Sequence, residues 1–492
     1  MEPRVMNQRY DCIVIGSDLS SLTAAAVLSR AGVKTLRLSE NAMPRRVEKG
    51  GFVFDADPLP RPGVVSNGLA AEGLRRRGIP FSATAGEPVG PGHQFILKNH
   101  RLNLFDDPAQ TVTEFVREFA VSSDLWQKLY DRGQTIIRCL DDVFSRYFEA
   151  PGQMTEAPAF SMKNLALQKQ NGLSFLRMRK RLEGSHPGLG KILHGNGFLF
   201  SNAATAEKYP LSSAYAFMAS FGGGRRTWGE KGELDQFLDN FCSSGGSDSL
   251  PGCTVMRFRV KGRIEVDLSL DGESWTVEGD RAVLSTKWEK LRPILLKGNG
   301  FSALEKKWSR VFHTGYPLTL HMGVRQEALP EQAGRSIVLL ENEKHPLMAH
   351  ELTCLSAGPG KNESSPGDDG RALSATVFLH QSPWRLSDTE LEDVFKTVLR
   401  NVFDFLPFLR DRLVFLDPSW SMDFSRKYQE ALNHNYGVPL SWFSPLSVFP
   451  SKTPLEKVFL TGGLQFPELG FDGEILSGIF SADAILGGTR HD

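Results

Sequence analysis

The stretch that decides the fold is YDCIVIGSDLSSLTAAAVLSRAGVKTLRLSE, residues 10–40. Residues 10–15 form a short apolar run, which is typical of a buried parallel strand. Residues 19–31 are rich in alanine and leucine at helical spacing, and residues 34–38 alternate as a second strand does. A strand, a turn, a helix and a strand within about 30 residues predict a βαβ unit.

The rest of the chain predicts a mixture of helices and short strands. The expected helices are 111–148, 162–182, 387–402 and 475–486, and the expected strands lie within 51–55, 254–285, 317–324, 336–341 and 458–462. Ser387 and Glu390 have the spacing of a capping box at a helix start. The stretch SAGPGKNESSPGDDG (356–370) is polar and rich in Gly, Pro and Ser, so it predicts a solvent loop.

Length and composition bound the class of protein. A chain of 492 residues is too long for one compact core and suits two domains. Lysine plus arginine equals aspartate plus glutamate, at 57 each, so we expect no nucleic-acid partner. No secretory signal and no apolar run of roughly 20 residues is seen, so a cytoplasmic location is expected. The five cysteines are scattered and show no metal-ligand spacing, so no metal site is expected either.

Four segments together resemble the phytoene desaturase and carotenoid isomerase group of FAD-dependent oxidoreductases, close to the flavin amine oxidases. Residues 10–40 stand where that family has its Gly-rich FAD fingerprint, and KGGFVFDADP (49–58) resembles the hairpin that follows it. TVMRFRVKGRIEVDLSLDGESWTVEGDRAVLST (254–286) resembles the strand block that returns the chain to the cofactor domain. VFLTGGLQFPELGFDGEILSGIFSADAIL (458–486) is similar to the motif that closes over the flavin.

The resemblance implies an α/β fold with a discontinuous Rossmann-type FAD/NAD(P)-binding domain and an inserted α+β substrate domain. We assign residues 1–75, 222–300 and 450–492 to the dinucleotide-binding domain, and 76–221 and 301–449 to the substrate domain. The implied activity is hydride transfer from an apolar substrate to FAD. Because such a cofactor carries the redox chemistry, few catalytic side chains are needed and none is assigned.

The fingerprint departs from the family pattern GxGxxG, where this chain has Gly16, Asp18 and Ser21. The first glycine makes the tight turn, the second admits the pyrophosphate, and the third lets helix and strand pack closely. At Asp18 a carboxylate stands at the helix N-terminus, where it caps the helix and repels a phosphate. Ser17 and Ser20, in the same turn, are further candidate cofactor contacts.

Two other cofactor positions of the family are also changed. The acidic residue that bonds the ribose falls at Ser39, with Glu40 one step later. One step turns a side chain to the opposite face, so Glu40 serves only if the strand ends early, and otherwise it is solvated. Arg45 and Arg46 replace a Gly-Gly pair beside the flavin, and they are expected either to pair with phosphates, Asp18 or another anion, or to lie in solvent.

The C-terminal motif keeps its glycines and lacks its acid. Gly462 is followed by Gly463 where the family has an acidic residue that holds the ribityl chain. Gly470 and Gly473 remain and shape the turn and the helix entry. Val255, in the returning strand block, is the remaining expected cofactor contact.

Framework positions therefore match the family while cofactor-touching positions do not, and two explanations stay open. In the first, FAD binds weakly or in a changed pose through backbone N–H groups, Arg45 and Arg46. In the second, the chain is a flavin-free relative that binds an apolar ligand or a protein partner, as the Rab GDP-dissociation inhibitors and escort proteins do with this fold. The apolar and basic stretch within 162–182 predicts either a peripheral membrane contact or a packed helix with a solvated basic side.

Overall fold

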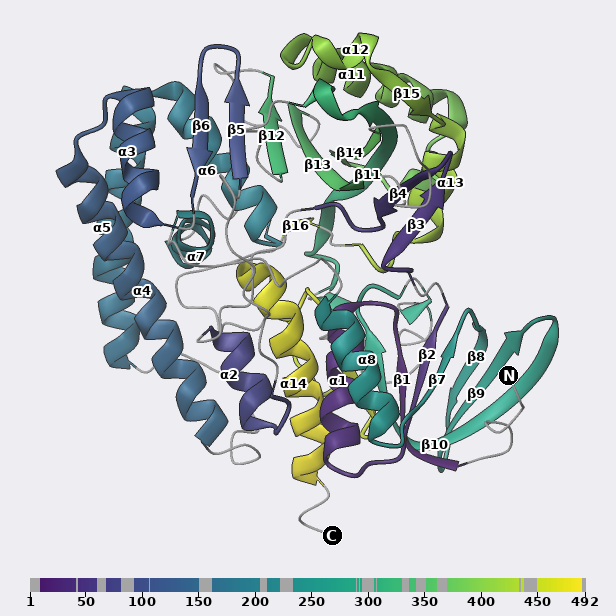
Figure 1. Cartoon of the computed structure of the whole chain (residues 1–492). Coiled ribbons are helices and arrows are strands. Elements are labelled where there is room, and N and C mark those ends of the chain that lie inside the picture. The colour runs from purple at the N-terminus through teal and green to yellow at the C-terminus, as the bar shows by residue number, and fades with distance from the viewer. Residues whose placement is uncertain are drawn as a thin grey trace.

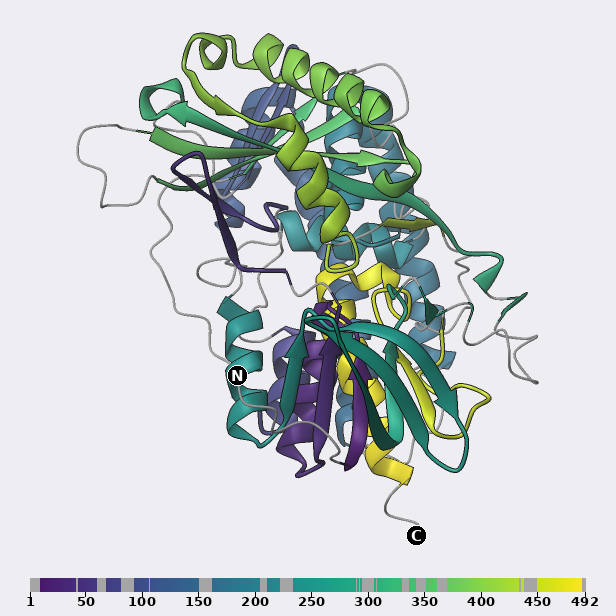
Figure 2. The same cartoon turned by 90° about the vertical axis from the view of Figure 1, so that its right-hand side faces the viewer.

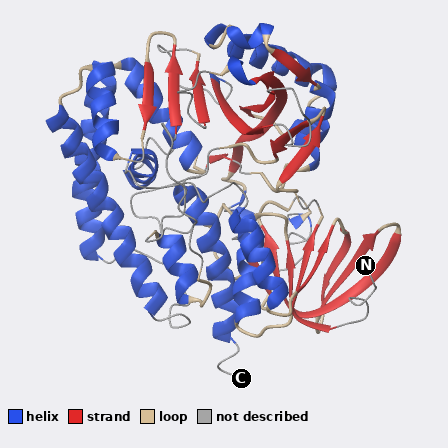
Figure 3. Ribbon diagram, in the orientation of Figure 1, coloured by secondary structure: helices blue, strands red, loops and turns tan. Residues whose placement is uncertain are grey.

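The computed structural model describes residues 9–40, 43–59, 68–80, 93–105, 107–149, 162–203, 210–221, 233–288, 290–291, 293, 305–306, 308–329, 336–341, 351–360, 370–432, 435–437 and 449–488. These residues form a lower part built on a seven-stranded sheet, an upper part built on an eight-stranded sheet, and a layer of long helices along one side (Figure 1 and Figure 3). The mixed α/β fold class expected from the sequence is confirmed.

The lower sheet contains the predicted βαβ unit. Its parallel strands are β7 (Asp248–Pro251), β2 (Thr35–Ser39), β1 (Arg9–Ile15), β10 (Glu273–Ser285) and β17 (Val458–Thr461). The first half of β10 also pairs antiparallel with β9 (Ile264–Leu270), which pairs with β8 (Thr254–Val260). The N-terminal and C-terminal segments of the chain thus meet in one sheet through β10, as the family resemblance implies.

Three helices cover one face of the lower sheet side by side: α1 (Leu19–Arg30), α14 (Gly470–Gly488) and α8 (Glu233–Ser244) (Figure 1). Val14 of β1 packs toward these helices, whereas Ile13 and Ile15 pack on the opposite face with residues of β8 and β9. Helices α1 and α14 lie at backbone distance, because a Cβ added to Gly478 would be 2.4 Å from the Ser20 carbonyl oxygen. Glycine at position 478 of α14 is therefore required by the packing of these two helices.

The upper sheet has the order β15 (Leu413–Leu416), β11 (Phe312–Arg325), β14 (Gly370–Leu379), β13 (Leu352–Gly360), β12 (Ser336–Leu340), β5 (His93–Leu97) and β6 (Arg101–Leu104), and β16 (Asn435–Gly437) pairs with the start of β11. Helices α11 (Asp388–Phe405), α12 (Phe408–Asp411) and α13 (Pro418–Lys427) pack on it, with α11 across the top in Figure 2. The hairpin of β3 (Arg46–Lys49) and β4 (Phe52–Asp55) also lies against this sheet, with Phe52 and Phe54 in a small aromatic core.

The helical layer comprises α2 (Leu69–Arg76), α3 (Pro108–Phe119), α4 (Ser123–Glu149), α5 (Met162–Ser185), α6 (Pro187–Phe200) and α7 (Pro210–Phe221). A buried ion pair ties this layer to α14. Arg77 Nε donates to Asp483 Oδ1 at 2.7 Å, and the Tyr147 hydroxyl donates to the other carboxylate oxygen at 3.2 Å. The long helices and the lower sheet therefore share one continuous core.

Three predictions of local structure need correction. The helix expected over 111–148 is two helices, α3 and α4, because Ala120 takes a left-handed conformation (φ 49°) and ends the first. The first residues of the expected loop 356–370 belong to β13, where pairing with β14 overrides their loop-like composition. The last helix begins at Gly470 rather than at residue 475. The capping box of Ser387 and Glu390 is confirmed.

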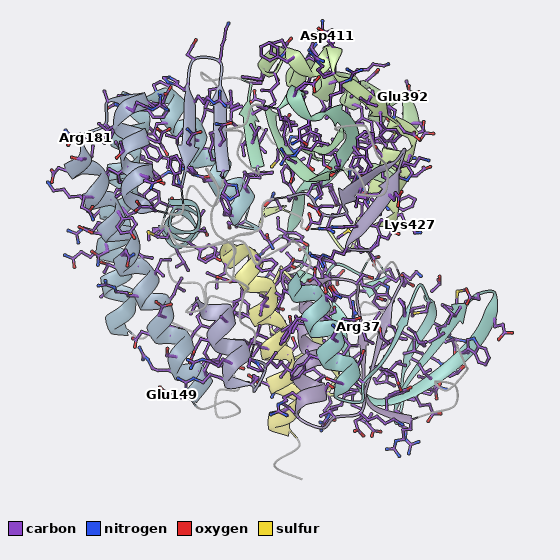
Figure 4. All side chains as sticks on the ribbon, in the orientation of Figure 1. Arg37, Glu149, Arg181, Glu392, Asp411 and Lys427 are labelled. Atoms are coloured by element: carbon purple, nitrogen blue, oxygen red, sulfur yellow. The ribbon has the colours of Figure 1, made fainter. Side chains whose placement is uncertain are left out.

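Helix α5 packs its apolar side inward and exposes a basic side. Phe175 and Leu182 are buried in the helical layer, and the buried Arg179 pairs with Glu183 at 2.6 Å. The exposed residues include Lys169, Leu173, Arg177, Lys180 and Arg181, the last at the outer edge of the molecule in Figure 4. In the described part of the chain no helix is long and apolar enough to cross a membrane.

Candidate functional site

The candidate site lies where the carboxyl ends of β1 and β10 meet the N-terminus of α1. Strand β1 has β2 on one side and β10 on the other, and ligands of open α/β sheets bind at such a switch point. Gly16 follows β1, and a Cβ there would lie 2.1 Å from Ser21 Oγ and 2.7 Å from Ser285 Cβ. The first fingerprint glycine thus keeps its role in the tight turn.

Asp18 is the N-cap of α1, as expected, and its carboxylate is enclosed by hydroxyl groups. Oδ1 accepts hydrogen bonds from the Ser21 N–H at 3.0 Å, from Ser21 Oγ at 2.6 Å and from Ser20 Oγ at 2.9 Å. Oδ2 accepts from Ser285 Oγ at 2.7 Å, and Asp18 is only 2% exposed. A pyrophosphate at this helix end would meet the Asp18 side chain where the family offers free N–H groups.

Neither of the two candidates for binding the ribose, Ser39 and Glu40, has a side chain that is both accessible and free to accept a ribose hydroxyl. Ser39 is fully buried and carries no acid, and its hydroxyl has no hydrogen-bond partner. The carboxylate of Glu40 accepts from the Val255 N–H at 2.6 Å, from Lys290 Nζ at 2.7 Å and from Trp288 Nε1 at 3.2 Å. The prediction of a solvated Glu40 is therefore wrong, because β2 ends at Ser39 and the chain turns the next side chain inward.

Val255 is engaged through both of its backbone polar groups. Its N–H donates to Glu40, and its carbonyl oxygen accepts from Lys290 Nζ at 3.0 Å. These bonds join β8, the end of β2 and the segment after β10. A ligand that reached the Val255 backbone would have to replace the Glu40 and Lys290 contacts.

Arg45 and Arg46 contact neighbouring protein elements. Arg45 Nη1 donates to Gln236 Oε1 on α8 at 3.1 Å. Arg46 Nε lies 4.0 Å from Asp55 Oδ1 on the adjacent strand of the hairpin. Arg45 therefore contacts α8 and Arg46 contacts β4, whereas Asp18 is hydrogen-bonded to serines.

The four C-terminal glycines are required by close packing of protein against protein. An added Cβ would lie 1.9 Å from Thr286 Oγ1 at Gly462, 2.8 Å from Asn202 Nδ2 at Gly463, 2.3 Å from the Phe200 carbonyl oxygen at Gly470 and 2.2 Å from the Phe466 carbonyl oxygen at Gly473. The Gly462 N–H donates to Ser477 Oγ at 2.7 Å. Close packing thus agrees with the framework role expected for Gly470 and Gly473, and the same packing applies at Gly462 and Gly463.

A buried ion pair that sequence reasoning missed lies beside Gly463. Lys287 Nζ is 2.5 Å from Glu474 Oε1, and the two side chains are 1% and 6% exposed. Lys287 Nζ also donates to the Leu432 carbonyl oxygen, just beyond α13, at 3.1 Å. An added Cβ at Gly463 would lie 3.2 Å from Glu474 Oε1, so the pair occupies the space beside the position where the family has its acid.

Tyr436 completes this group of polar residues. Burial raises the pKa of its phenol well above the ordinary value, and the neighbouring carboxylates of Glu474 and Asp18 raise it further. We call Asp18, Ser285, Lys287, Tyr436 and Glu474 the polar cluster. Two signals in the sequence point to it, since Ser285 ends a predicted strand that Lys287 follows, and Glu474 is an acid directly before the predicted C-terminal helix.

The positions that the family uses to hold FAD are bonded to, or packed against, protein groups in this chain. Asp18 stands where the family has its second fingerprint glycine, Glu40 is bound to Lys290, and the Lys287–Glu474 pair adjoins Gly463, where the family has its acid. Protein atoms alone bury the expected contacts Gly16, Asp18, Ser20, Ser21, Ser39, Gly462, Gly463, Gly470 and Gly473. Among the described side chains, no group of three or more His, Cys, Asp or Glu residues is placed to hold a metal ion.

Comparison with known sequences finds relatives named prolycopene isomerases, while no family model matches. A chloroplastic prolycopene isomerase of Daucus carota is 21% identical over 509 residues, which cover 97% of this chain and 80% of that protein. Prolycopene isomerase 1 of an Oncidium hybrid cultivar is 23% identical over 357 residues, 68% of this chain. The chain spans 58% of the length of that Oncidium protein.

Solved structures of amine oxidases share the fold over nearly the whole chain. Putrescine oxidase bound to putrescine has a TM-score of 0.58 at 15% identity and covers 97% of this chain and 99% of its own. An oxidoreductase from Methanosarcina mazei has a TM-score of 0.52 at 13% identity, with 96% and 99% covered. Cyclohexylamine oxidase from Brevibacterium oxydans has a TM-score of 0.50 at 16% identity, with 98% and 100% covered. This chain therefore has the fold of the flavin amine oxidases and resembles the phytoene desaturase-like FAD-dependent oxidoreductases, with altered cofactor motifs.

Proposed function

We propose that this chain is a flavin-free relative of the phytoene desaturase-like oxidoreductases that binds an apolar ligand and transfers no hydride to flavin. The observation that carries the proposal is the position of the Asp18 carboxylate and its hydrogen bonds. Its carboxylate caps α1 at the pyrophosphate position and is satisfied there by Ser20, Ser21 and Ser285. A buried carboxylate with four donors gains nothing from a nucleotide and repels one.

The expectation of an apolar ligand rests on the relatives. The curated relatives are named prolycopene isomerases, which supports an apolar molecule as the ligand of this chain as well. In this fold the ligand has to bind through apolar contacts and a few polar groups, because such sites are mostly apolar with a small number of oriented polar side chains. The chemistry that remains without a redox cofactor is binding and orientation.

The competing function is that of an FAD-dependent oxidoreductase, and the family resemblance favours it. It requires Asp18 to give up its bonds to Ser20, Ser21 and Ser285, and the carboxylate to leave the helix end. It also brings the ribityl chain beside the buried Lys287–Glu474 pair, and parting that pair would be costly because each charge would then lack its partner. Binding of FAD would therefore be accompanied by a large rearrangement of the polar cluster.

Absorbance and flavin release decide between the two functions. The purified protein is expected to show no bands in the visible range and to release no flavin when it is denatured. Titration with FAD, followed by quenching of flavin fluorescence, is expected to show no saturable binding at micromolar concentrations. A yellow protein that releases stoichiometric FAD would overturn the flavin-free proposal.

The apolar ligand is tested in the same preparation. Nile red, an uncharged apolar dye, is expected to bind with a saturable rise in fluorescence and to be displaced by long-chain hydrocarbons. A colourless protein that binds neither FAD nor Nile red would contradict the proposal of an apolar ligand, while the proposal that the protein holds no flavin would stand. The two parts of the proposal are thus tested separately.

A further inference from the structure

A second buried carboxyl group lies outside the polar cluster and has no partner for one of its oxygens. Glu468 is the middle residue of the short 3-10 helix η5 (Pro467–Leu469), just before α14, and it is 7% exposed. Its Oε2 atom is fully buried and makes no hydrogen bond. The flanking Phe466 and Leu469 belong to the main apolar core. Burial raises the pKa of Glu468 to about 8, so the carboxyl group is mostly protonated at neutral pH.

Helix η5 lies at a junction of three elements. The Asn202 N–H and Ser201 Oγ, at the end of α6, donate to the Pro467 carbonyl oxygen at 2.8 and 3.0 Å. Helix α7 also packs against η5. The Tyr215 hydroxyl of α7 donates to Asp472 Oδ2, at the start of α14, at 2.8 Å. Figure 1 shows the N-terminal end of α14 reaching this region beneath α6 and α7.

The helices of this junction carry further unsatisfied polar atoms. Asn196 of α6 is 1% exposed, and neither its amide oxygen nor its amide nitrogen has a hydrogen-bond partner. Ser212 of α7 is fully buried, and its hydroxyl is likewise without a partner. A buried polar atom without a partner destabilises a folded protein, so several on neighbouring elements call for an explanation.

Charged groups of α14 and α6 already have protein partners. Asp472 accepts from Tyr215, Glu474 pairs with Lys287, and Lys191 of α6 lies 3.4 Å from Glu351. A protonated Glu468 donates a hydrogen bond and carries no charge, so it suits an oxygen acceptor better than a cation. An uncharged oxygen atom on an apolar molecule fits this environment.

We propose that Glu468 recognises the oxygen-bearing end of an otherwise apolar ligand, of the class of long-chain alcohols or aldehydes, at the junction of η5, α6 and α7. This inference rests on the proposed function, because it assigns the polar contact of the same ligand. The carboxyl group donates to the ligand oxygen, and the apolar residues around η5 receive the hydrocarbon chain.

Two probes of equal size test the recognition of oxygen. Displacement of Nile red by 1-decanol and by undecane is measured for the wild type and for three variants, E468M, E468Q and E392Q. Methionine keeps the volume and removes both oxygens, glutamine keeps a donor and an acceptor, and Glu392 is an exposed residue of α11 that serves as a surface control. The ratio of the undecane Kd to the decanol Kd is compared among variants, which cancels the difference in hydrophobicity between the probes.

The ratio is expected to fall about tenfold in E468M, the loss of one hydrogen bond, and to stay within about threefold of wild type in E468Q and E392Q. Thermal unfolding checks that each variant is folded. An unchanged ratio in E468M overturns the inference while the apolar ligand stands. If neither probe nor Nile red binds to the wild type, the apolar ligand of the proposed function is contradicted and the inference fails with it.

Discussion

Ser285 Oγ donates a 2.7 Å hydrogen bond to Asp18 Oδ2, joining two residues that are 267 positions apart in the sequence. The bond links the carboxyl ends of β10 and β1, the neighbouring parallel strands between which this class of sheet binds its ligands. It uses the carboxylate that stands in place of the second fingerprint glycine. The contact therefore lies at the place where this class of sheet binds its ligands.

Replacing Asp18 tests how much this contact stabilises the fold. D18A is expected to lower the free energy of unfolding by about 2–4 kcal/mol, because it removes the helix cap and leaves buried serine hydroxyls without an acceptor. D18N keeps an acceptor oxygen at the cap and is expected to lose less than half as much. Urea unfolding followed by circular dichroism measures both. A D18A loss below about 0.5 kcal/mol would show that the serines find other partners.

Restoring the family residues tests whether the nucleotide site is only lightly altered. The triple variant D18G/S39E/G463D returns the glycine and the two acids to the fingerprint positions. It is expected to gain no measurable FAD affinity, because a side chain introduced at position 463 meets Asn202 and the Glu474 carboxylate. Flavin fluorescence quenching is the measurement. Saturable FAD binding by the triple variant would show that these three positions alone had disabled the site.

The parts of the fold that depend on local sequence were predictable. The strand, helix and strand of residues 10–40 follow from apolar periodicity, and the capping role of Asp18 follows from its place before an apolar helix. The break at Ala120 was not, because a left-handed alanine has no composition signal. The strand pairing of residues 356–360 was missed because it is decided by β14.

The site was less predictable, because its side chains choose distant partners. Glu40 turns inward to meet Lys290 and Trp288, which are about 250 positions away along the chain. The ion pair of Lys287 and Glu474 joins two segments whose motifs were noticed separately. Sequence pattern locates the framework of such a site, but the pairing of its charges depends on tertiary contacts that no local spacing records.

Breaking the buried ion pair is expected to destabilise the protein strongly. K287M leaves the Glu474 carboxylate buried without its cation, and a loss of about 3–5 kcal/mol in unfolding free energy is expected. The double variant K287M/E474Q removes both charges and is expected to recover most of that loss. A double-mutant cycle in guanidinium chloride measures the coupling. Equal stability of K287M and the wild type would mean that the charge of Glu474 is satisfied by other groups.

The protonation of Glu468 gives a pH dependence of stability with a defined sign. Its pKa is about 8 in the folded protein against the ordinary 4.5, so the unfolded chain releases this proton first as the pH rises. The stability that the group contributes is fully present below about pH 4.5 and is lost progressively until the pH passes about 8. The loss over this window is on the order of 5 kcal/mol.

E468Q cannot ionise, so its unfolding free energy is expected to rise relative to wild type as the pH increases from 5 to about 8 and then to level off. Taking the difference between the two proteins at each pH cancels the other titrating groups, which both proteins share. E392Q, changed at an exposed acid, is expected to follow the wild-type curve. Urea unfolding at four values between pH 5 and pH 9 makes the comparison. Parallel curves for wild type and E468Q would mean that Glu468 is ionised in the folded protein, because a group that titrates alike in both states contributes no slope.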